Sequence, residues 1–563
     1  MVNVNRQTFS RLWRLVRPFF WSEVKWQARG LLCLLAIFVL CIQGVAVLLS
    51  YVGRDFMTYL NLKEEPLFFR SLLIYLAAYG LSTLISVCQS YTEQRTALLW
   101  RMTLSRQMLH KYFSQLAFYR IGYAEGIDNP DQRLEEDIRT FTTATLSLFI
   151  ILCNSLLQAV LFIGILWSIS INLIIAVIAY ALIGSVITYF IGRPLIGLNF
   201  AQLKKEADYR YKLVNVRDNA ESIAFYRGDR KELTRTRQRL KKALENYLRI
   251  IKVNRNLNFF IVLYNNLKPV VLPVVIVSPL YLAGKIEFGV VTQSADAFVR
   301  VVEALSILIQ NFGTISNIAA VVTRLGSFNE ALESATHEEG ADLPQIKTFV
   351  EPRVDFQGVT IMTPKRDQTL VKELSIELKS GGLLIVGGSG NGKSSLLRAL
   401  AGLWTAGAGT IVRPSLDQCV FLPQRSYLIL GSLRNQLMYA TRRRGISDQE
   451  LEKVLRQVGL DTALERVHGL GAVANWNSLL SAGEQQQLAF ARLFLAKPKY
   501  AFLDEATTAI DSATEATLYQ MLTNHVTAFI SVGYRANLAR YHRLILQINE
   551  DSSWYLERQP RGK

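Results

Sequence analysis

Six long apolar runs occupy much of the first 325 residues of this 563-residue chain, and polar stretches separate them. Each run holds roughly 20 or more residues, which is enough for an α-helix to cross the hydrocarbon core of a bilayer. The sequence therefore predicts an all-α transmembrane domain of six helices over residues 30–325. The spans are expected at Gly30–Val52, Pro66–Ser90, Thr145–Ile169, Asn172–Ile191, Phe260–Ala283 and Ala297–Val322.

Basic residues are distributed unevenly between the apolar runs. The net charge is +18, and the long stretches 91–144 and 192–259 are rich in Arg and Lys. The opposite connections are short and carry few basic residues, chiefly Arg54, Lys63 and Lys285. Because cytoplasmic loops hold the excess of Lys and Arg, both long stretches and both termini are expected in the cytoplasm. We expect no nucleic-acid partner, because the basic stretches flank membrane spans.

Residues 1–29 are predicted to form an N-terminal helix at the membrane surface. Arg11, Arg14 and Arg17 alternate with apolar and aromatic residues such as Trp13 and Phe19. This pattern is typical of an interfacial helix whose basic residues lie at the level of the lipid headgroups. It is equally typical of an amphipathic helix that packs on the protein itself.

Polar residues within the predicted spans are few and include Asn154, Gln158, Asn265, Asn266, Lys268, Arg300 and Glu303. Charges at membrane depth are costly unless they face a cavity or each other. These residues therefore indicate either a polar translocation path or a local arrangement in which Arg300 pairs with Glu303 and Lys268 reaches the interface. The sequence does not separate the two interpretations.

The apolar periodicity ends near residue 326, and a polar, mixed-charge linker is predicted over 326–352. From residue 353 to 563, short strands alternate with loops and helices, which is typical of an α/β nucleotide-binding domain. The chain is therefore expected to join a membrane domain to a P-loop domain.

A glycine-rich loop in the second domain fits the pattern G-x-x-x-x-G-K-[ST] and lies between an apolar strand and a helix. Its backbone N–H groups and the helix N-terminus form a site for phosphate groups. Lys393 is predicted to reach the outer phosphates, and the Ser394 hydroxyl to coordinate Mg²⁺. The residues predicted to bind nucleotide here are Gly387, Gly388, Ser389, Gly390, Asn391, Gly392, Lys393, Ser394 and Ser395.

Two carboxylates end an apolar strand about 110 residues after this loop. Asp504 is predicted to hold the Mg²⁺ shell, and Glu505 to orient or deprotonate the attacking water. Gln424 also follows a short strand and is predicted to reach the Mg²⁺ or the water. Together with Lys393 and Ser394, these three residues predict ATP as the nucleotide and Mg²⁺ as the metal ion.

A second helix start has features of an anion site. Ser481 is placed to cap it, and the small residues Ala482 and Gly483 allow another anion to approach closely, with Glu484 following. A chain with two such helix starts suggests a dimer in which each nucleotide lies between one chain's loop and the other chain's cap. Ser481, Gly483 and Glu484 are therefore predicted to contact nucleotide, and a second copy of the chain is the expected partner.

Together these motifs resemble those of an ABC transporter half-molecule, and the resemblance covers nearly the whole chain. The matching segments are Walker A (387–395), the Q-loop glutamine Gln424, the signature (480–485), Walker B (502–505) and the D-loop (508–511). The resemblance implies a six-helix transmembrane domain of the type IV exporter kind, fused to an α/β P-loop ATPase domain. It also implies a multi-pass protein of the bacterial inner membrane, with lipid around its spans and its ATPase domain in the cytoplasm.

Three further features resemble the D subfamily, which includes peroxisomal fatty-acyl transporters and bacterial proteins related to YddA and to SbmA/BacA. They are the loop 128–137, which begins Asp128-Asn129-Pro130, the loop 219–226 and Trp476 before the signature. The resemblance implies that the two loops couple the ATPase domain to the spans in alternating access. It implies a hydrophilic compound or peptide, or a lipid or fatty-acyl group, as the substrate, which the sequence does not identify.

The chain departs from the family pattern at three positions. Tyr534 stands where a switch histidine is usual, Gln487 replaces a basic residue after the signature, and 360–364 lacks an adenine-stacking aromatic residue. Tyrosine can donate a hydrogen bond to phosphate but cannot carry the charge of histidine. We therefore expect Tyr534 to take part in ATP hydrolysis, at a lower rate than in a relative that has the histidine. The alternative is an ATP-gated membrane sensor or channel-like protein with slow turnover. His542 lies too far along the chain to replace the histidine without a rearrangement.

Overall fold

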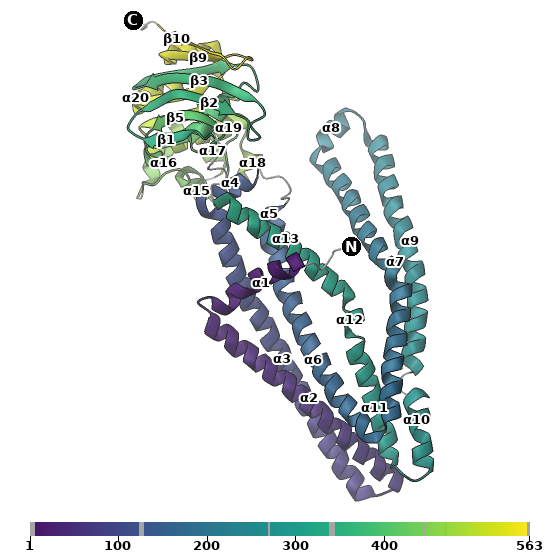
Figure 1. Ribbon diagram of the computed structural model, residues 1–563. Coiled ribbons are helices and arrows are strands. Elements are labelled where there is room, and N and C mark those ends of the chain that lie inside the picture. Colours follow the sequence, from purple (N-terminus) through teal and green to yellow (C-terminus); the bar gives the residue numbers. More distant parts are fainter. Residues whose placement is uncertain are drawn as a thin grey trace. The chain divides into compact units, whose positions relative to one another are not determined.

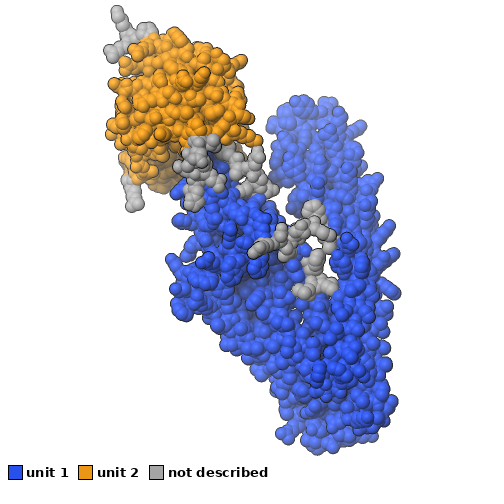
Figure 2. All heavy atoms as spheres, viewed as in Figure 1, with its two compact units in different colours: residues 1–339 blue, residues 340–563 orange. Residues whose placement is uncertain are grey.

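The computed structural model describes residues 6–122, 129–267, 271–336, 344–443, 445–467 and 469–559. The chain divides into two compact units, residues 1–339 and residues 340–563 (Figure 2). Lys268 and the first residue of the predicted 128–137 motif lie outside the described residues.

Unit 1 is built from helices (Figure 1). Its first helices are α1 (Arg6–Trp21), α2 (Lys25–Leu62), α3 (Glu65–Phe113), η1 (Ser114–Leu116), α4 (Ala117–Ile121), α5 (Pro130–Gln132), the π-helical turn η2 (Arg133–Asp137) and α6 (Ile138–Ile169). The later ones are α7 (Ile171–Asp218), α8 (Ala220–Phe225), α9 (Asp229–Leu267), α10 (Val271–Leu282), α11 (Phe288–Leu305), α12 (Ile307–Gln310) and α13 (Phe312–Thr336).

Five helical stretches are long and apolar enough to cross a membrane, among the residues that the structure describes. They are Lys25–Leu62, Glu65–Ile121, Pro130–Ile169, Ile171–Asp218 and Asp229–Leu282, and each contains or overlaps one of the first five predicted spans. The helices continue well beyond the apolar runs and into the basic stretches, as the bounds of α3, α7 and α9 show. Apolar length alone does not reveal these extensions.

The sixth predicted span corresponds to α11, α12 and α13, which are separated by the single residues Ser306 and Asn311. Backbone hydrogen bonds of the i to i−4 kind cross both points: Ser306 N–H donates to Val302, and Ile315 N–H donates to Asn311. The segment is therefore one helical path with two local irregularities, and none of its three parts is among the five long stretches.

Polar residues of the spans bond to one another across helices. The Gln43 amide donates to Asn154 at 3.2 Å, and the Gln158 amide donates to the Arg300 carbonyl at 3.0 Å. The Arg300 guanidinium bonds to Asp296, one turn earlier, at 2.8 Å. One of the two interpretations paired Arg300 with Glu303, whereas the structure pairs Arg300 with Asp296.

α7 and α9 run side by side as a long hairpin with α8 at its tip (Figure 1). Tyr180 and Tyr264 stack with their ring centroids 4.3 Å apart, and each hydroxyl donates to the other residue's carbonyl. Further along the hairpin, Asn246 donates to Gln202 at 2.9 Å, and Lys212 forms an ion pair with Glu232. These contacts hold two largely exposed helices together.

Unit 2 contains two sheets and their covering helices. Its strands are β1 (Lys347–Val350), β2 (Val354–Met362), β3 (Thr369–Leu378), β4 (Gly381–Gly387), β5 (Gly407–Arg413), β6 (Cys419–Leu422), β7 (Tyr500–Asp504), β8 (Ala528–Val532), β9 (Leu544–Ile548) and β10 (Trp554–Arg558). Its helices are α14 (Lys393–Leu400), η3 (Leu416–Gln418), α15 (Leu433–Met438), α16 (Asp448–Gln457), α17 (Asp461–Arg466), α18 (Trp476–Leu479), α19 (Ala482–Ala496), α20 (Ser512–His525) and η4 (Ala536–Tyr541).

The six-stranded sheet has the order β10-β9-β4-β8-β7-β6, and all its neighbouring strands pair in parallel except β10. The second sheet has the order β1-β5-β2-β3. β4, β7 and β8 are almost fully buried, as expected of parallel strands covered on both faces. Because β4, β6, β7 and β8 run in the same direction, the loops that follow them meet at one edge of the sheet.

Candidate active site

The phosphate loop joins β4 directly to α14, as the sequence predicts. Gly387 and Gly392 have φ angles of 154° and 83°. A Cβ at Gly387 would lie 2.4 Å from the Ile548 carbonyl oxygen, and one at Gly392 would lie 2.8 Å from the Leu370 Cβ. Both positions therefore require glycine.

The loop carries the donors that a polyphosphate needs. The first N–H groups of α14 have no carbonyl partner within their own helix, and they face the loop. The Asn391 amide donates to the Ile548 carbonyl at 3.2 Å and ties the loop to β9. Gly388, Ser389 and Gly390 form its exposed turn, and Ser395 is buried in the first turn of α14. The residues present thus fit a bound nucleotide.

Lys393 is buried, and its ammonium group has three oxygen acceptors. It donates to the carbonyls of Gly387 at 2.9 Å and Gly388 at 2.6 Å, and to the Tyr534 hydroxyl at 2.6 Å. The Nζ atom also lies 4.6 Å from the centroid of the Tyr534 ring. Tyr534 is half exposed, so its side chain approaches the loop from the solvent side.

The structure brings the remaining predicted catalytic residues to the same edge. The Ser394 hydroxyl donates to Asp504 at 2.9 Å, and the Gln424 amide donates to Glu505 at 2.8 Å. Glu505 has a φ angle of 48°, an uncommon conformation for a residue with a side chain, and its N–H donates to the Val532 carbonyl at 3.1 Å. The strained backbone turns the carboxylate toward Gln424.

The Ser394 hydroxyl, the Asp504 carboxylate and the Gln424 amide are oxygen donors of the kind that Mg²⁺ prefers. No group of three or more His, Cys, Asp or Glu side chains within the described ranges could hold a metal ion alone. This donor set therefore fits an ion that shares its shell with nucleotide phosphates and water.

Ser481 caps α19, and Glu484 completes a capping box. The Ser481 N–H donates to the Glu484 carboxylate at 2.8 Å, and Arg466 forms an ion pair with the same carboxylate. A Cβ at Gly483 would lie 2.7 Å from the Ala509 carbonyl oxygen, so no larger residue fits without a shift. At this helix start, Ser481 and Ala482 are exposed.

Two residues that the sequence analysis did not single out bind the D-loop. Arg535 donates to the carbonyls of Thr508 and Ile510, both at 3.0 Å. Gln486 donates to the Thr508 hydroxyl at 3.0 Å and accepts from the Ala509 N–H at 2.9 Å. Their only sequence signal is adjacency, because Arg535 follows Tyr534 and Gln486 follows the signature.

A buried arginine joins α19 to the segment after Gln424. Arg492 donates to the Tyr427 carbonyl at 2.6 Å, to the Gln436 carbonyl at 2.7 Å and to the Gln436 side chain at 2.9 Å. Burial lowers its pKa to about 10, so the guanidinium is still charged at neutral pH. The segment next to Gln424 is thus fixed to the helix that begins at the signature.

His542 does not reach the phosphate loop. It is buried against Tyr519 and Phe529, and its Nδ1 bonds to the Leu538 carbonyl at 2.7 Å. Burial lowers the pKa of His542 to about 4, so the ring is neutral at physiological pH. The histidine therefore belongs to the core, and Tyr534 is the side chain that contacts Lys393.

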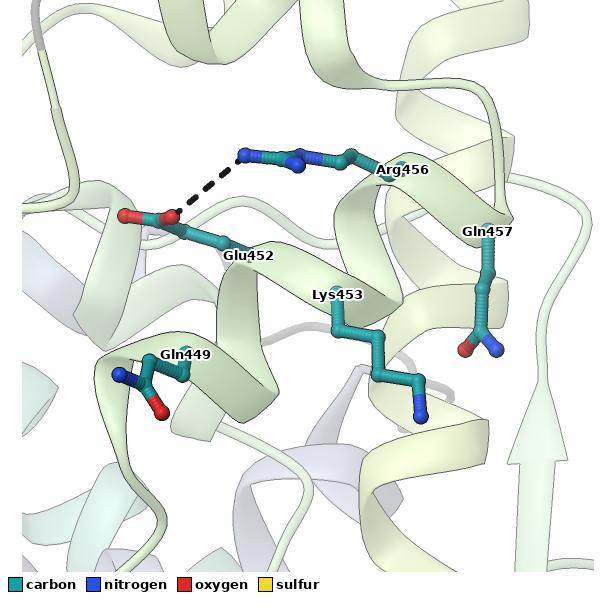
Figure 3. A pocket seen from close by; sticks show the side chains of 5 residues that line it. All are labelled: Gln449, Glu452, Lys453, Arg456 and Gln457. Atoms are coloured by element: carbon teal, nitrogen blue, oxygen red, sulfur yellow. Dashed lines mark ion pairs between the residues drawn. The ribbon is translucent and has the colours of Figure 1, made fainter.

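One hollow in unit 2 is lined by residues other than these. It has a volume of about 520 Å³ and is lined by one face of α16 (Figure 3). Glu452 and Arg456 form an ion pair there at 3.8 Å. None of the predicted nucleotide-binding or catalytic residues lines it, so it is not part of the candidate active site.

Comparison with protein families supports the division into two functional parts. Residues 15–282 match the family described as ABC transporter transmembrane region 2, and residues 371–508 match the family described as ABC transporter. The second match contains the phosphate loop, the signature and the strand that ends at Asp504. It therefore implies that unit 2 binds ATP.

Similar proteins occur in bacteria and in eukaryotes. An uncharacterized ABC transporter ATP-binding protein of Synechocystis sp. is 41% identical over 95% of this chain and 82% of its own. The chloroplastic ABC transporter D family member 2 of Arabidopsis thaliana is 35% identical over 98% of this chain and 88% of its own length. The lysosomal cobalamin transporter of Homo sapiens is 31% identical over 82% of this chain and 81% of its own length.

A bacterial Atm1-family ABC exporter, solved with ATP bound, shares the fold with a TM-score of 0.72. The two sequences are 19% identical, and the match covers 93% of this chain and 94% of the exporter chain. The apolar helices and the bacterial relatives make this a multi-pass protein of the inner-membrane type. The chain belongs to the ABC transporter family, as a half-transporter with D-subfamily relatives that couples ATP hydrolysis to membrane transport.

Proposed function

We propose that two copies of this chain form a homodimeric transporter with ATP bound between them. The observation that carries this proposal is that the two predicted anion sites lie at the starts of two different helices of one chain, α14 and α19, and that the start of α19 is exposed. Lys393 and Ser394 meet Asp504 at the phosphate loop, whereas Ser481 is exposed at the start of α19 and bonds within its own cap. A second chain would supply its Ser481 and Gly483 to the nucleotide on the first.

Within each site, Lys393 would bind the outer phosphates, and Ser394, Asp504 and Gln424 would hold Mg²⁺. The ion would neutralise charge that develops on the phosphates. Glu505 would orient the attacking water and accept its proton. Glu484 would position the cap rather than touch the nucleotide, because its carboxylate is engaged by Ser481 and Arg466.

Closure of the two ATPase units would move the spans through the loops at the ends of the long helices. α8 and the residue after it expose Phe225 and Tyr226, which suits the loop 219–226 to docking. The described part of the 128–137 motif is different. Asp137 is buried and forms a bidentate pair with Arg324 of α13 at 2.8 and 2.5 Å. This motif would act as a brace between α6 and α13.

The substrate is either a hydrophilic compound or peptide, or a lipid or fatty-acyl compound. Arg300 favours an anionic cargo less than its charge suggests, since Asp296 neutralises it. Similarity to the human cobalamin transporter supports a large polar molecule. ATP hydrolysis would drive alternating access by favouring one conformation of the spans in the ATP-bound state.

An ATPase assay on the full-length protein in proteoliposomes tests this function. Glu505→Gln should retain ATP binding but lower turnover by about 10²–10⁴-fold, the usual contribution of a general base. Glu550→Gln, an exposed acid in the turn between β9 and β10, is the matched control and should hydrolyse at the parental rate. Parental turnover in Glu505→Gln would refute the assigned role.

The alternative is an ATP-gated membrane protein with slow turnover, which the contact of Tyr534 with Lys393 favours. Candidate substrates loaded into the same vesicles separate the two. A transporter shows substrate-stimulated hydrolysis together with movement of the substrate, whereas a gate changes conformation on binding ATP without sustained turnover.

A further inference from the structure

The N-terminal helix α1 has two different faces. Leu15 and Phe19 are buried, and the Phe19 ring stacks on Trp100 of α3 with centroids 5.5 Å apart. Arg11 binds Glu330 of α13 through two hydrogen bonds, at 3.1 and 2.7 Å. One face of α1 is therefore fixed to unit 1 by apolar packing and a bidentate ion pair.

A cavity of about 220 Å³ lies between this fixed helix, α3 and α13. Its charged and amide side chains are Arg14, Arg17, Gln107, Lys111, Asn329 and Glu333. Three of these are cationic and one is acidic, so the lining carries an excess of positive charge.

The acidic groups near the cavity already have partners. Glu333 accepts from Lys111 at 2.7 Å, and Glu330, 3.8 Å from Arg14, is held by Arg11. No carboxylate within the described ranges lies at ion-pair distance from Arg17, which instead lies 5.8 Å from the Trp21 ring. Arg14 and Arg17 thus provide donors that the protein itself satisfies only in part.

The helix α1, which lines one side of the cavity, also carries exposed aromatic side chains of the kind found at the edge of a membrane. Phe9, Trp13, Trp21 and Trp26 are between 52% and 73% exposed, and they lie on α1 and at the start of the first span. Tryptophan is enriched where lipid headgroups meet the hydrocarbon core, and basic residues there attract anionic lipids. Positive-inside orientation puts this end of the span at the cytoplasmic leaflet.

We propose that this cavity binds the phosphate-bearing headgroup of an anionic lipid. Arg14 and Arg17 would donate to the phosphate, Gln107 would bond to the neighbouring polar part, and the exposed aromatic side chains would lie against the acyl chains. Free phosphate offers the same anionic oxygens, but the exposed aromatic side chains of α1 favour a lipid. The site is distinct from the nucleotide site and does not depend on the transported substrate.

Thermal unfolding of the full-length protein in detergent tests the proposal. Phosphatidylglycerol should raise the melting temperature in a saturable way, whereas phosphatidylcholine and inorganic phosphate should not. Each arginine near an anionic surface contributes about fivefold in affinity. Arg17→Gln should therefore raise the half-saturating lipid concentration about fivefold, and Arg14→Gln combined with Arg17→Gln about 25-fold.

Arg29→Gln is the matched control, because Arg29 lies 5.5 Å from the ring of exposed Trp26 and does not line the cavity. It should leave the lipid titration unchanged. An equal loss in Arg29→Gln, or none in the double variant, would overturn the proposal in favour of general surface attraction. Stabilisation by inorganic phosphate alone that the double variant loses would show a site for soluble anions and overturn the assignment to lipid.

Discussion

Tyr534 contacts the lysine that the nucleotide needs. Its hydroxyl accepts from Lys393 at 2.6 Å, at the place where a terminal phosphate would otherwise compete for that ammonium group. Tyrosine can donate one hydrogen bond to the phosphate, but it cannot carry a positive charge. Binding of ATP is thus compatible with Tyr534, whereas stabilisation of the charge that develops during hydrolysis is weaker.

We predict that Tyr534→His raises ATP turnover by on the order of tenfold, because histidine restores an ionisable donor at this position. Steady-state ATPase assays on the parent and the variant measure the effect. Tyr534→Phe is the control, since it keeps the ring near Lys393 and removes only the hydroxyl. No gain in Tyr534→His would count against the role of Tyr534, and an equal gain in Tyr534→Phe would attribute the gain to release of Lys393.

His542 makes the stability of unit 2 sensitive to pH. Its pKa is lowered to about 4 by burial, while the unfolded chain keeps a pKa near 6.5. Between these values the unfolded state binds the proton and the folded state does not. The free energy of unfolding is therefore highest above pH 6.5. It falls as the pH decreases toward 4, by roughly 3 kcal/mol in total.

Melting of the full-length protein between pH 7 and pH 4.5 measures this dependence. His542→Leu should be less stable at pH 7, because the Leu538 carbonyl loses its partner, yet its melting temperature should fall less with acidification. His525→Leu, at an exposed position on α20, should keep the parental slope. The same slope in His542→Leu as in the parent would exclude His542 as the group responsible.

At the scale of single residues, the sequence predicted side chains whose chemistry depends on a motif. The structure pairs Ser394 with Asp504 and Gln424 with Glu505, because each of these residues follows or ends a parallel strand. Arg535 could not be found this way. Its contacts with the D-loop depend on the path of the chain after β8, and the spacing of residues along the sequence does not predict that path.

Among the elements, α19 links the signature to the segment that contains Gln424. Arg492 lies in the C-terminal half of this helix, and its guanidinium donates to the carbonyls of Tyr427 and Gln436 on two other segments. The Trp476 indole donates to the Gly431 carbonyl at 2.7 Å and fixes the same segment from α18. A shift of α19 would therefore move the backbone beside Gln424.

We predict that Arg492→Lys lowers the free energy of unfolding of unit 2 by about 2–5 kcal/mol, because lysine cannot reproduce the buried fork of hydrogen bonds. Turnover should fall as well, since Gln424 loses its fixed position. Thermal unfolding and ATPase assays on the full-length protein report the two effects. Arg456→Lys, at an exposed residue of α16, should change neither. An unaltered melting temperature in Arg492→Lys would contradict the role of Arg492 in holding α19 to the segment after Gln424.

The elements of unit 1 show where hydropathy stops being informative. Apolar length located the spans, because the membrane requires continuous helical hydrogen bonding. It did not locate the helical extensions of α3, α7 and α9, which are stabilised by polar contacts such as Lys212 with Glu232. It also did not identify the π-helical turn η2, whose Asp137 is buried only because Arg324 of α13 lies opposite it.

At the scale of the whole molecule, the main consequence of the proposed dimer is that each ATP site would be shared. One chain's Lys393 would bind the phosphates, and the other chain's exposed helix start at Ser481 would cover them. Ala482 allows this to be tested without harming the fold. It is the first residue of α19 and exposed, so a glutamate there is favourable for the helix but repels a nucleotide.

We predict that Lys393→Ala and Ala482→Glu chains are each inactive as homodimers but recover activity when co-expressed. A mixed dimer has one site with both defects and one site with none. If half of the dimers are mixed and their intact sites work independently, about a quarter of the parental ATPase activity should return. Purification through two different affinity tags isolates the mixed dimer, which should then show about half of the parental activity. The control is the pair Lys393→Ala and Glu505→Gln, because each defect then falls on a different phosphate-loop site and neither site is intact. Recovery in that control, or none in the first pair, would contradict a site shared between two chains.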